Sequence, residues 1–360
     1  MGFSLEEIKK IFNFKRMGKL TTYQRNKYYQ SLYQSKVEDI KNKIKSLKSA
    51  KNNLEEKITE LKKENEKNTI KLGIDLSVLS LFSCPKCNSE LKLSAEKVEE
   101  NQILEGSLNC ECGQSLKIRD GIIYSDKYEN DLGDKSKEVE ENHIEDYIKS
   151  TDPDFIDKSY ESLEWLKRQF ENEKIENKVV MEPGSGYGHF LRQIYDGLDN
   201  NTVYICIDYK AELNKYLKKL LEMTAKKAKV IFITATFANI PIKNNSIDFL
   251  VDFTGTSDYA FTNKEFLPKL LSDYLKEDSI YIASFIAYDK FGSKAVVSLP
   301  YRDNFKYKKI KSNILDLAFE IEKEYKSEIV NIDKTMGKYE DFAQPGDRLF
   351  SYQVKAKRRS

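Results

Sequence analysis

The segment that most constrains the fold is the decapeptide 179–188, in which an apolar run ends in Glu182 and three glycines follow at every second position. Glycine has no Cβ, so it lets the backbone turn sharply from a strand into a helix and approach a ligand closely. A second apolar run, 203–207, ends in Asp208, twenty residues after Gly188. A carboxylate there can bind the two hydroxyls of a ribose. The pattern predicts a parallel sheet that holds a nucleoside-type cofactor.

The spacing of the glycines narrows the choice of cofactor. A dinucleotide fingerprint needs G-x-G-x-x-G, whereas here the third glycine comes one residue early and is followed by His189. The observed form, E-x-G-x-G-x-G, resembles motif I of the S-adenosylmethionine (SAM)-dependent methyltransferases. Residues 238–251 resemble the loop and fourth strand of that family. The resemblance covers roughly residues 150–360 and implies an α/β fold, a seven-stranded doubly wound sheet with helices on both faces.

The resemblance also implies a set of SAM-binding residues. Glu182 would accept a hydrogen bond from the methionine ammonium, and Asp208 would bind the ribose. The family usually places an acidic residue after the third strand, where this chain has Thr236, and Phe237 could stack on the adenine. The expected cofactor site comprises Glu182, Gly184, Ser185, Gly186, Gly188, Asp208, Thr236 and Phe237.

Candidate acid/base residues follow the predicted fourth strand, 247–252. The loop after it lacks the N-P-P-Y motif of amino-directed methyltransferases and has no cysteine nucleophile. Asp252, Asp258 and Tyr259 are the catalytic candidates, although simple loop or capping roles remain open for each. We expect His189 to cap or pack beside the glycine loop.

The remaining pattern completes the sheet. We expect a third strand at 229–233, a fifth at 279–286, a helix at 310–321 and two further strands near 328–332 and 349–355. The last of these resembles the antiparallel final strand of the methyltransferase family. Residues 288–309, which are rich in Tyr, Phe and Lys, occupy the usual place of a substrate-binding insertion.

Four of the five cysteines form two close pairs, Cys84 with Cys87 and Cys110 with Cys112. Two such turns can present four thiolates to one tetrahedral zinc, and a four-thiolate site is closed and structural rather than catalytic. The segment resembles the small zinc ribbons that precede some bacterial methyltransferase domains. A redox pair is the alternative, but the C-x-x-C does not open a helix after a strand.

The N-terminal segment predicts helices. Ser4 and Glu7 form a capping-box pattern that opens a short helix with an apolar face of Leu5, Ile8 and Ile11, and Thr21 or Thr22 can cap a longer one. From Val37 the apolar residues are spaced alternately by three and four, which predicts a coiled-coil seam that needs a partner helix. The seam comprises Val37, Ile40, Ile44, Leu47, Lys51, Leu54, Ile58 and Leu61.

Residues 2–11 and the heptad helix resemble the second half of a MerR-family transcriptional regulator. That resemblance implies a homodimer through an antiparallel coiled coil. The winged helix-turn-helix of that family would precede Gly2, so we expect no specific DNA binding by this chain as it stands. The surplus of Lys and Arg in residues 1–66 is interpreted as a solvated coiled-coil face.

A chain of 360 residues with a net charge of only +2 predicts several units and gives no general argument for nucleic acid. We expect a MerR-like coiled coil at 1–70, a zinc ribbon at 81–125, an acidic linker at 126–150 and a methyltransferase-like domain at 151–360. No apolar run reaches a membrane span, so a soluble, cytoplasmic protein is expected. Two functions remain: a SAM-dependent methyltransferase whose small-molecule or macromolecular acceptor is unknown, or a MerR-type regulator whose methyltransferase-like domain senses a ligand.

Overall fold

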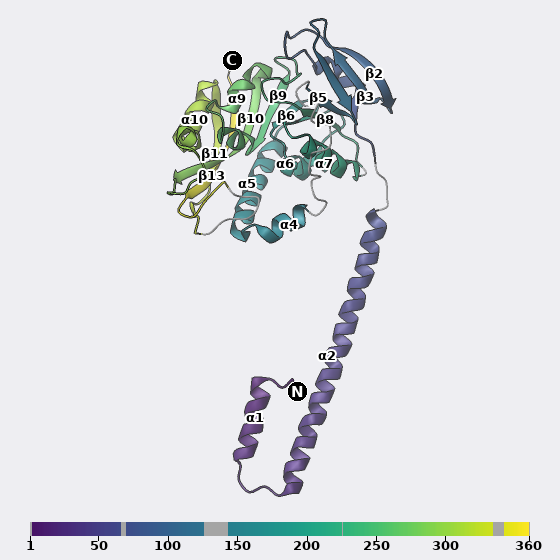
Figure 1. Ribbon diagram of the computed structural model, residues 1–360, viewed down its shortest axis with the longest axis vertical. Coiled ribbons are helices and arrows are strands. Elements are labelled where there is room, and N and C mark those ends of the chain that lie inside the picture. The colour runs from purple at the N-terminus through teal and green to yellow at the C-terminus, as the bar shows by residue number, and fades with distance from the viewer. Residues whose placement is uncertain (1, 66–69, 126–142, 225, 334–341, 360) are drawn as a thin grey trace. The chain divides into compact units, whose positions relative to one another are not determined.

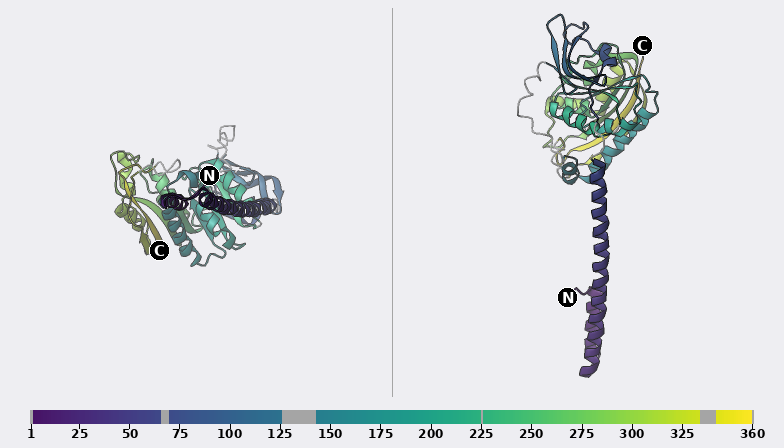
Figure 2. Two further views of the ribbon diagram at one scale, coloured as in Figure 1. Left: turned by 90° about the horizontal axis from the view of Figure 1, so that it is seen from below. Right: turned by 90° about the vertical axis from the view of Figure 1, so that its right-hand side faces the viewer.

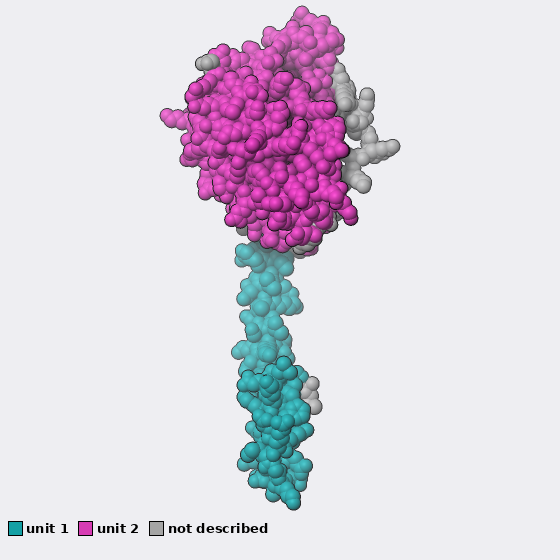
Figure 3. Space-filling view, turned by 90° about the vertical axis from the view of Figure 1, so that its left-hand side faces the viewer, with its two compact units in different colours: residues 1–68 teal, residues 69–360 magenta. Residues whose placement is uncertain are grey.

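The computed structural model describes residues 2–65, 70–125, 143–224, 226–333 and 342–359. Residues 126–142 of the expected acidic linker lie outside this described part, and its last residues belong to helix α4 (His143–Ser150). The chain divides into two compact units, residues 1–68 and residues 69–360 (Figure 3). Within the described residues, no helix has both the length and the apolar character that a bilayer crossing requires.

The first unit is a helical hairpin. Helix α1 (Leu5–Arg16) has the predicted capping box, in which Ser4 Oγ accepts from the Glu7 N–H and the Glu7 carboxylate accepts from the Ser4 N–H. Helix α2 (Thr22–Asn65) begins after Thr21, which makes the same exchange with Gln24. At 44 residues, α2 is about 66 Å long.

The face that α1 presents to α2 differs from the expected one. Aromatic rings make the contacts: Phe14 stacks on Tyr28 with centroids 3.6 Å apart, and Phe3 lies 6.2 Å from Tyr33. Leu5 of the predicted face is instead 80% exposed. The aromatic side chains bury more apolar area per residue than leucine, so they decide which side of α1 turns inward.

The second unit is built around one continuous mixed sheet (Figures 1 and 2). Along its main path the strand order is β1-β3-β4-β5-β8-β7-β6-β9-β10-β13-β11, with β2 paired to β3 and β12 to β13. Its central strands are β6 (Val179–Pro183), β7 (Val203–Asp208), β8 (Lys229–Thr234), β9 (Ile247–Phe253) and β10 (Leu275–Lys290). These five run parallel, whereas β13 (Arg348–Arg358) is antiparallel to both of its neighbours, β10 and β11 (Phe319–Lys326). The mixed α/β sheet was expected, but within the described residues it has thirteen strands rather than seven, and the seven from β8 to β11 along the main path are one part of it.

Two apolar cores cover the two faces of this sheet, because alternate strand residues point to opposite sides. One core packs the inward faces of α5 (Pro153–Glu171), α6 (His189–Ile194) and α7 (Ala211–Glu222) against one face. The other packs α9 (Leu267–Leu270) and α10 (Tyr307–Asp316) against the opposite face. The sheet is therefore wound on both sides, as the resemblance to the methyltransferases implied.

The expected end of the sheet is shifted by several residues. Helix α10 ends at Asp316 rather than 321, and the strand expected near 328–332 is formed by β11, with only the short β12 (Val330–Asn331) in the predicted place. Strand β11 reads Phe-Glu-Ile-Glu-Lys-Glu-Tyr-Lys, and most of it is exposed. Its charged residues lie on an edge strand, where a helical pattern and a strand pattern of charges are hard to distinguish.

The cysteine-bearing segment belongs to the same sheet. Strands β2 (Lys92–Glu99), β3 (Gln102–Asn109), β4 (Ser115–Arg119) and β5 (Ile122–Tyr124) form an antiparallel meander, which the two-residue β1 (Ile74–Asp75) borders. Strand β5 then pairs in parallel with β8. The meander therefore extends the central sheet, and residues 69–360 form one compact unit.

Candidate functional site

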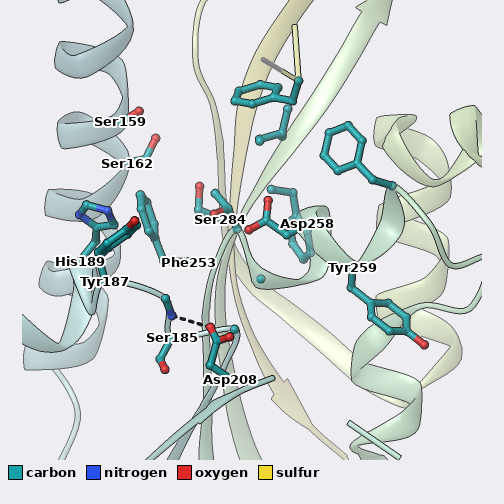
Figure 4. Close-up of a pocket in the computed structure, with 18 of the residues that line it drawn as sticks. Ser159, Ser162, Ser185, Tyr187, His189, Asp208, Phe253, Asp258, Tyr259 and Ser284 are labelled. Carbon is teal, nitrogen blue, oxygen red and sulfur yellow. Dashed lines mark hydrogen bonds between the residues drawn. The ribbon is translucent and has the colours of Figure 1, made fainter. Parts of the chain in front are cut away.

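A cavity of about 1010 Å³ lies at the carboxyl ends of the central strands (Figure 4). Strands β6, β7 and β8 succeed one another in one direction across the sheet, and β9 and β10 then lie on the other side of β6. The winding direction thus reverses between β6 and β9. In open α/β sheets this reversal point is where ligands bind, because the loops after the two strands diverge and leave a crevice.

Glycines allow the two loops at this reversal to pack backbone against backbone. A Cβ added to Gly184, which has φ +67°, would lie 3.0 Å from Gly255 Cα. A Cβ on Gly255 would lie 2.2 Å from the Pro183 carbonyl oxygen, closer than any real side chain allows. Gly184 and the first residue of helix α8 (Gly255–Ala260) must therefore both be glycine, because a side chain at either position would clash with the backbone of the other loop.

Gly188 has a different role from the one expected. It does not line the cavity, has φ +70° and faces α7, where an added Cβ would lie 2.3 Å from Leu217 Cδ1. The helix that it caps, α6, has only six residues. Gly188 serves close packing of α6 on α7, whereas Gly184, Ser185 and Gly186 form the cavity wall.

Asp208 ends β7 and holds the glycine loop. One carboxylate oxygen accepts from the Gly186 N–H at 3.0 Å and the other from the Lys210 N–H at 2.9 Å. Burial raises the pKa of this carboxyl, while the two hydrogen bonds oppose the rise. The carboxylate lies on the cavity wall beside the glycine loop (Figure 4), as a ribose-binding carboxylate would.

Glu182 lies deeper, at the end of β6. It is 2% exposed, and its carboxylate accepts a hydrogen bond of 2.8 Å from the hydroxyl of the fully buried Tyr204. Burial raises the pKa of Glu182 to about 8, and the nearby charges of Asp252 and Asp208 add to the rise. A carboxyl so placed is ready to pair with a cationic ligand that enters the cavity, because that ligand would restore the charged form.

The residues after β8 lie at the side of the cavity. Thr236 and Phe237 both line it, as expected of an adenine-binding segment. Phe237 meets Tyr259 edge to face, with ring centroids 5.7 Å apart. Burial raises the pKa of Tyr259, which keeps its hydroxyl protonated near neutrality, and its ring points away from Asp258 (Figure 4). This placement favours a packing role for Tyr259 over proton transfer.

The structure separates the two aspartates that the sequence grouped as catalytic candidates. Asp252 is fully buried, does not line the cavity, and accepts hydrogen bonds from Thr256 and from the Tyr281 hydroxyl at 3.2 Å. It fixes the start of α8. Asp258 does line the cavity, and its carboxylate points toward the cavity centre near Ser284 (Figure 4). Of the two, only Asp258 can touch a bound molecule.

His189 lies in an aromatic group beside the glycine loop. Its ring centroid is 6.2 to 6.4 Å from those of Tyr147, Tyr187 and Phe253. This is the packing role that the sequence suggested.

Most of one side of the cavity was not predicted from the sequence, because it is made by elements far apart in the chain. The expected substrate-binding insertion, residues 288–309, contributes only Val296 to it among the described residues. The side chains on this side of the cavity come from α5, from the end of α8, from β10 and the segments that follow it, and from β13, and no local motif connects them. Its apolar members are Phe155, Phe261, Ile286, Val296, Val330, Phe342, Leu349 and Phe350.

The four predicted cysteines come together at the other end of the sheet. Their sulfur atoms all lie within 4.8 Å of one another, with Cys84 and Cys112 at 3.6 Å and Cys87 and Cys110 at 3.4 Å. Four thiolates around a zinc ion would have their sulfurs about 3.8 Å apart, given Zn–S bonds of about 2.3 Å in a tetrahedron. This four-cysteine cluster therefore has the dimensions of a tetrahedral metal site.

Comparisons with known proteins give only distant likenesses. No family model matches the chain, and no curated protein matches it. A SAM-dependent methyltransferase from Aquifex aeolicus is similar at 15% identity over 53% of this chain and 88% of its own, with a TM-score of 0.37. A geranyl diphosphate C-methyltransferase from Streptomyces coelicolor, solved with S-adenosyl-L-homocysteine, is similar at 12% identity over 55% of this chain and 76% of its own, with a TM-score of 0.42. A phosphoethanolamine N-methyltransferase from Haemonchus contortus is similar at 12% identity over 56% of this chain and 53% of its own, with a TM-score of 0.40. At such low scores the function has to be argued from the cavity itself.

Proposed function

We propose that the chain is a SAM-dependent methyltransferase. The observation that carries this proposal is the convergence of three carboxyl groups, Glu182, Asp208 and Asp258, on one cavity at the reversal point of the sheet. SAM carries a sulfonium and an ammonium, so it is a cation over the part that would lie near these groups. Opposite charge stabilises the ionised carboxylates that burial disfavours.

The same charges argue against a dinucleotide. A pyrophosphate is anionic and needs N–H or cationic donors around it. Two lysines line the cavity among the described residues: Lys158 is already paired with Glu161 at 3.0 Å, and Lys210 follows Asp208 closely in the chain, donating its backbone N–H to that carboxylate. Three carboxyls with so little opposing charge would repel a pyrophosphate.

Each residue of the cofactor end then has a physical task. Glu182 would accept from the methionine ammonium, and Asp208 from the ribose hydroxyls. Phe237 would lie against the adenine, supported edge to face by Tyr259. SAM supplies an electrophilic methyl group, so the protein must only orient the acceptor, exclude water and receive a proton.

The test of cofactor binding is calorimetry with S-adenosylhomocysteine. We expect binding to the wild-type chain and no binding of NAD⁺. Asp208→Ala should weaken the affinity at least tenfold, because it removes both the ribose contacts and the hydrogen bonds that hold the glycine loop. Absence of heat and of a thermal shift at millimolar S-adenosylhomocysteine, with folded protein, would overturn the proposal.

For the four-cysteine cluster we propose a structural zinc. Each pair of cysteines lies in a turn closed by backbone hydrogen bonds, such as Asn88 N–H to Cys84 O at 2.8 Å and Gly113 N–H to Cys110 O at 3.0 Å. Asn88 and Gly113 adopt positive φ, which lets the turns present both thiols to one point. Four sulfur ligands leave no open position for a substrate, so this metal would stabilise the meander rather than catalyse.

We further propose a homodimer through α2. Every apolar member of the predicted seam is exposed in the chain by itself, from Ile40 at 42% to Leu47 at 69%. A stripe of seven large apolar side chains along one helix is unfavourable in water, and its two-in-seven spacing fits a second helix.

The charges beside the seam favour an antiparallel pair, the orientation that we propose. In a parallel pair Lys51 would face the partner's Lys51, and Lys43 would lie beside the partner's Lys48. In an antiparallel pair centred on the seam, Lys51 faces the partner's Leu47 instead, and Lys41 comes near the partner's Glu55. The antiparallel pair thus removes the Lys51 repulsion from the seam and gains the attraction between Lys41 and the partner's Glu55, although Lys48 would still lie beside the partner's Lys48 and Lys43 beside the partner's Lys57.

A further inference from the structure

The cavity extends well beyond the residues that would hold SAM. Its far side is bounded by three phenylalanines from separate parts of the chain: Phe155 on α5, Phe261 after α8, and Phe342 before β13. The Phe155 and Phe342 rings lie 5.8 Å apart and the Phe261 and Phe342 rings 6.3 Å apart, each at 60°. Behind them, Phe305 lies 4.8 Å from Phe261. These rings form an aromatic wall, which is suited to a flat apolar body.

Asp258 lines the same cavity as the aromatic wall and the cofactor end. Glu182, Asp208 and Asp252 each accept hydrogen bonds from the protein. Among the described residues, in contrast, no N–H or O–H donates to the Asp258 carboxylate, which reaches only the cavity. A carboxylate without a protein donor is available to a donor on a bound molecule.

We propose that this far side is the acceptor subsite and that it takes an uncharged small molecule with an aromatic ring bearing a hydroxyl. The inference rests on the proposed methyltransferase function. The ring lies against the aromatic wall of Phe155, Phe261 and Phe342, and the hydroxyl donates to Asp258.

The transfer that follows is balanced without any further reactant. Asp258 accepts the hydroxyl proton, and the hydroxyl oxygen gives an electron pair to the methyl carbon of SAM. The bond between that carbon and sulfur breaks, and its electron pair stays on sulfur, so the neutral thioether leaves. The products are an aryl methyl ether, S-adenosylhomocysteine and protonated Asp258, which returns its proton to solvent.

The chemistry of the site selects this class of acceptor. The Asp258 side chain is exposed to the cavity, yet the protein around it removes enough water to raise its pKa to about 7, with Asp252 and Asp208 adding to the rise and Lys210 opposing it. A base with that pKa is well matched to an aromatic hydroxyl, whose pKa of about 10 is that of tyrosine, and poorly matched to an aliphatic alcohol. An anionic acceptor would meet the three cavity carboxyls and be repelled.

The experiment uses 2-naphthol as a probe with the full chain. Binding is measured by calorimetry in saturating S-adenosylhomocysteine, and methyl transfer from SAM is followed as 2-methoxynaphthalene by mass spectrometry. We expect the rate of methyl transfer to rise with pH through about 7. In Asp258→Asn the rate should fall at least about 100-fold, while the affinity for 2-naphthol is retained. Phe155→Ala should raise the naphthol KM about tenfold or more, whereas Tyr160→Ala, on the same helix but outside the cavity, should not.

The outcomes separate this inference from the cofactor proposal. If S-adenosylhomocysteine binds but 2-naphthol neither binds nor is methylated, the subsite is misassigned and the cofactor proposal stands. Equal or better transfer to 4-hydroxybenzoate would overturn the requirement for an uncharged acceptor. Unchanged transfer in Asp258→Asn would overturn its role as the base. If S-adenosylhomocysteine itself does not bind, the proposed methyltransferase function is refuted, and the acceptor subsite with it.

Discussion

The carboxyl groups around the cavity have little cationic charge near them: Glu182 and Asp252 are buried, and Asp258 is exposed to the cavity. Loss of surrounding water raises the pKa of Asp252 to about 6, of Asp258 to about 7 and of Glu182 to about 8. Each of these groups binds a proton in the folded chain at pH values where the unfolded chain has already lost it. Ionising these carboxyl groups is thus unfavourable in the folded protein, and such perturbed pKa values often occur at functional sites.

The raised pKa values predict how the free energy of unfolding depends on pH. Because the folded-state pKa values lie above the unfolded ones, the folded state holds more protons, and stability falls as pH rises from about 5 to 8. Each extra proton contributes a slope of about 1.4 kcal/mol per pH unit. These carboxyls therefore lower the melting temperature of the cofactor-free protein as pH rises from 6 to 8. A zinc held by four thiolates acts in the opposite direction, because the unfolded thiols still hold protons at these pH values.

Glu182→Gln is the informative variant, because glutamine keeps the shape and cannot ionise. Between pH 6 and pH 8 its melting temperature should fall less, or rise more, than that of the wild-type chain, as measured by scanning calorimetry. Glu277→Gln, at an exposed position of β10, should leave the slope unchanged. A slope in Glu182→Gln as steep as that of the wild type would contradict a raised Glu182 pKa.

At the scale of elements, the glycine loop depends on how α6 packs on α7. Gly188→Ala places a Cβ against Leu217 and requires a left-handed backbone, so it should destabilise the second unit by about 1–3 kcal/mol. Gly197→Ala is the matched control, because a Cβ there meets open space. Chemical denaturation measures both. Equal stability of the two variants would mean that α6 and α7 can separate at little cost.

The four-cysteine cluster should be coupled mechanically to the cofactor end. The Lys243 N–H donates to Leu81 O at 2.8 Å and the Ser83 N–H to Pro241 O at 3.3 Å, only a few residues after Thr236 and Phe237. We expect one zinc per chain by elemental analysis. Its removal by Cys84→Ser should speed hydrogen exchange at 81–84 and at 240–243.

Cys206 supplies the control for the metal site, because it is the one cysteine that lies outside the cluster, buried in β7. Cys206→Ala should retain the zinc, whereas Cys84→Ser should lose it. Protein purified without chelator that contains no zinc would count against the metal site. Unchanged exchange at 240–243 after metal loss would show that the two ends of the sheet are independent.

At the scale of the whole molecule, the state of association depends on α2. Replacing Ile44 and Leu47 together by Asp places two charges within the exposed seam, where a partner helix would bury them. We expect a dimer for the wild-type chain and a monomer for this variant by light scattering at micromolar concentration.

The control adds the same two charges beside the seam. Ser46 and Asn53 lie on the outer side of the heptad pattern, so the chain with Ser46→Asp and Asn53→Asp should remain dimeric. A monomeric wild-type chain at that concentration would refute the dimer. Antiparallel pairing would bring spin labels at Lys41 and at the partner's Glu55 together, and a long distance between them would indicate the parallel arrangement.

The sequence alone determined the features that are local along the chain. Glycine spacing, capping residues and alternating apolar runs act over a few residues, so the capping box at Ser4, strands β6 to β9 and the pairs of cysteines could be predicted from their neighbours. The predicted loop residues Gly184, Ser185 and Gly186 line the cavity for the same reason. Edge strand β11 was misplaced because its alternating charges give little apolar signal.

Only the tertiary structure decided what depends on residues distant in sequence. It made the cysteine meander an extension of the central sheet through the pairing of β5 with β8, and it turned Gly188 toward Leu217. It also distinguished Asp252 from Asp258, which are six positions apart. Packing places one beneath the loop with Tyr281 and leaves the other facing the cavity. Burial and charge surroundings are set by elements far apart in the chain, so no local pattern records them.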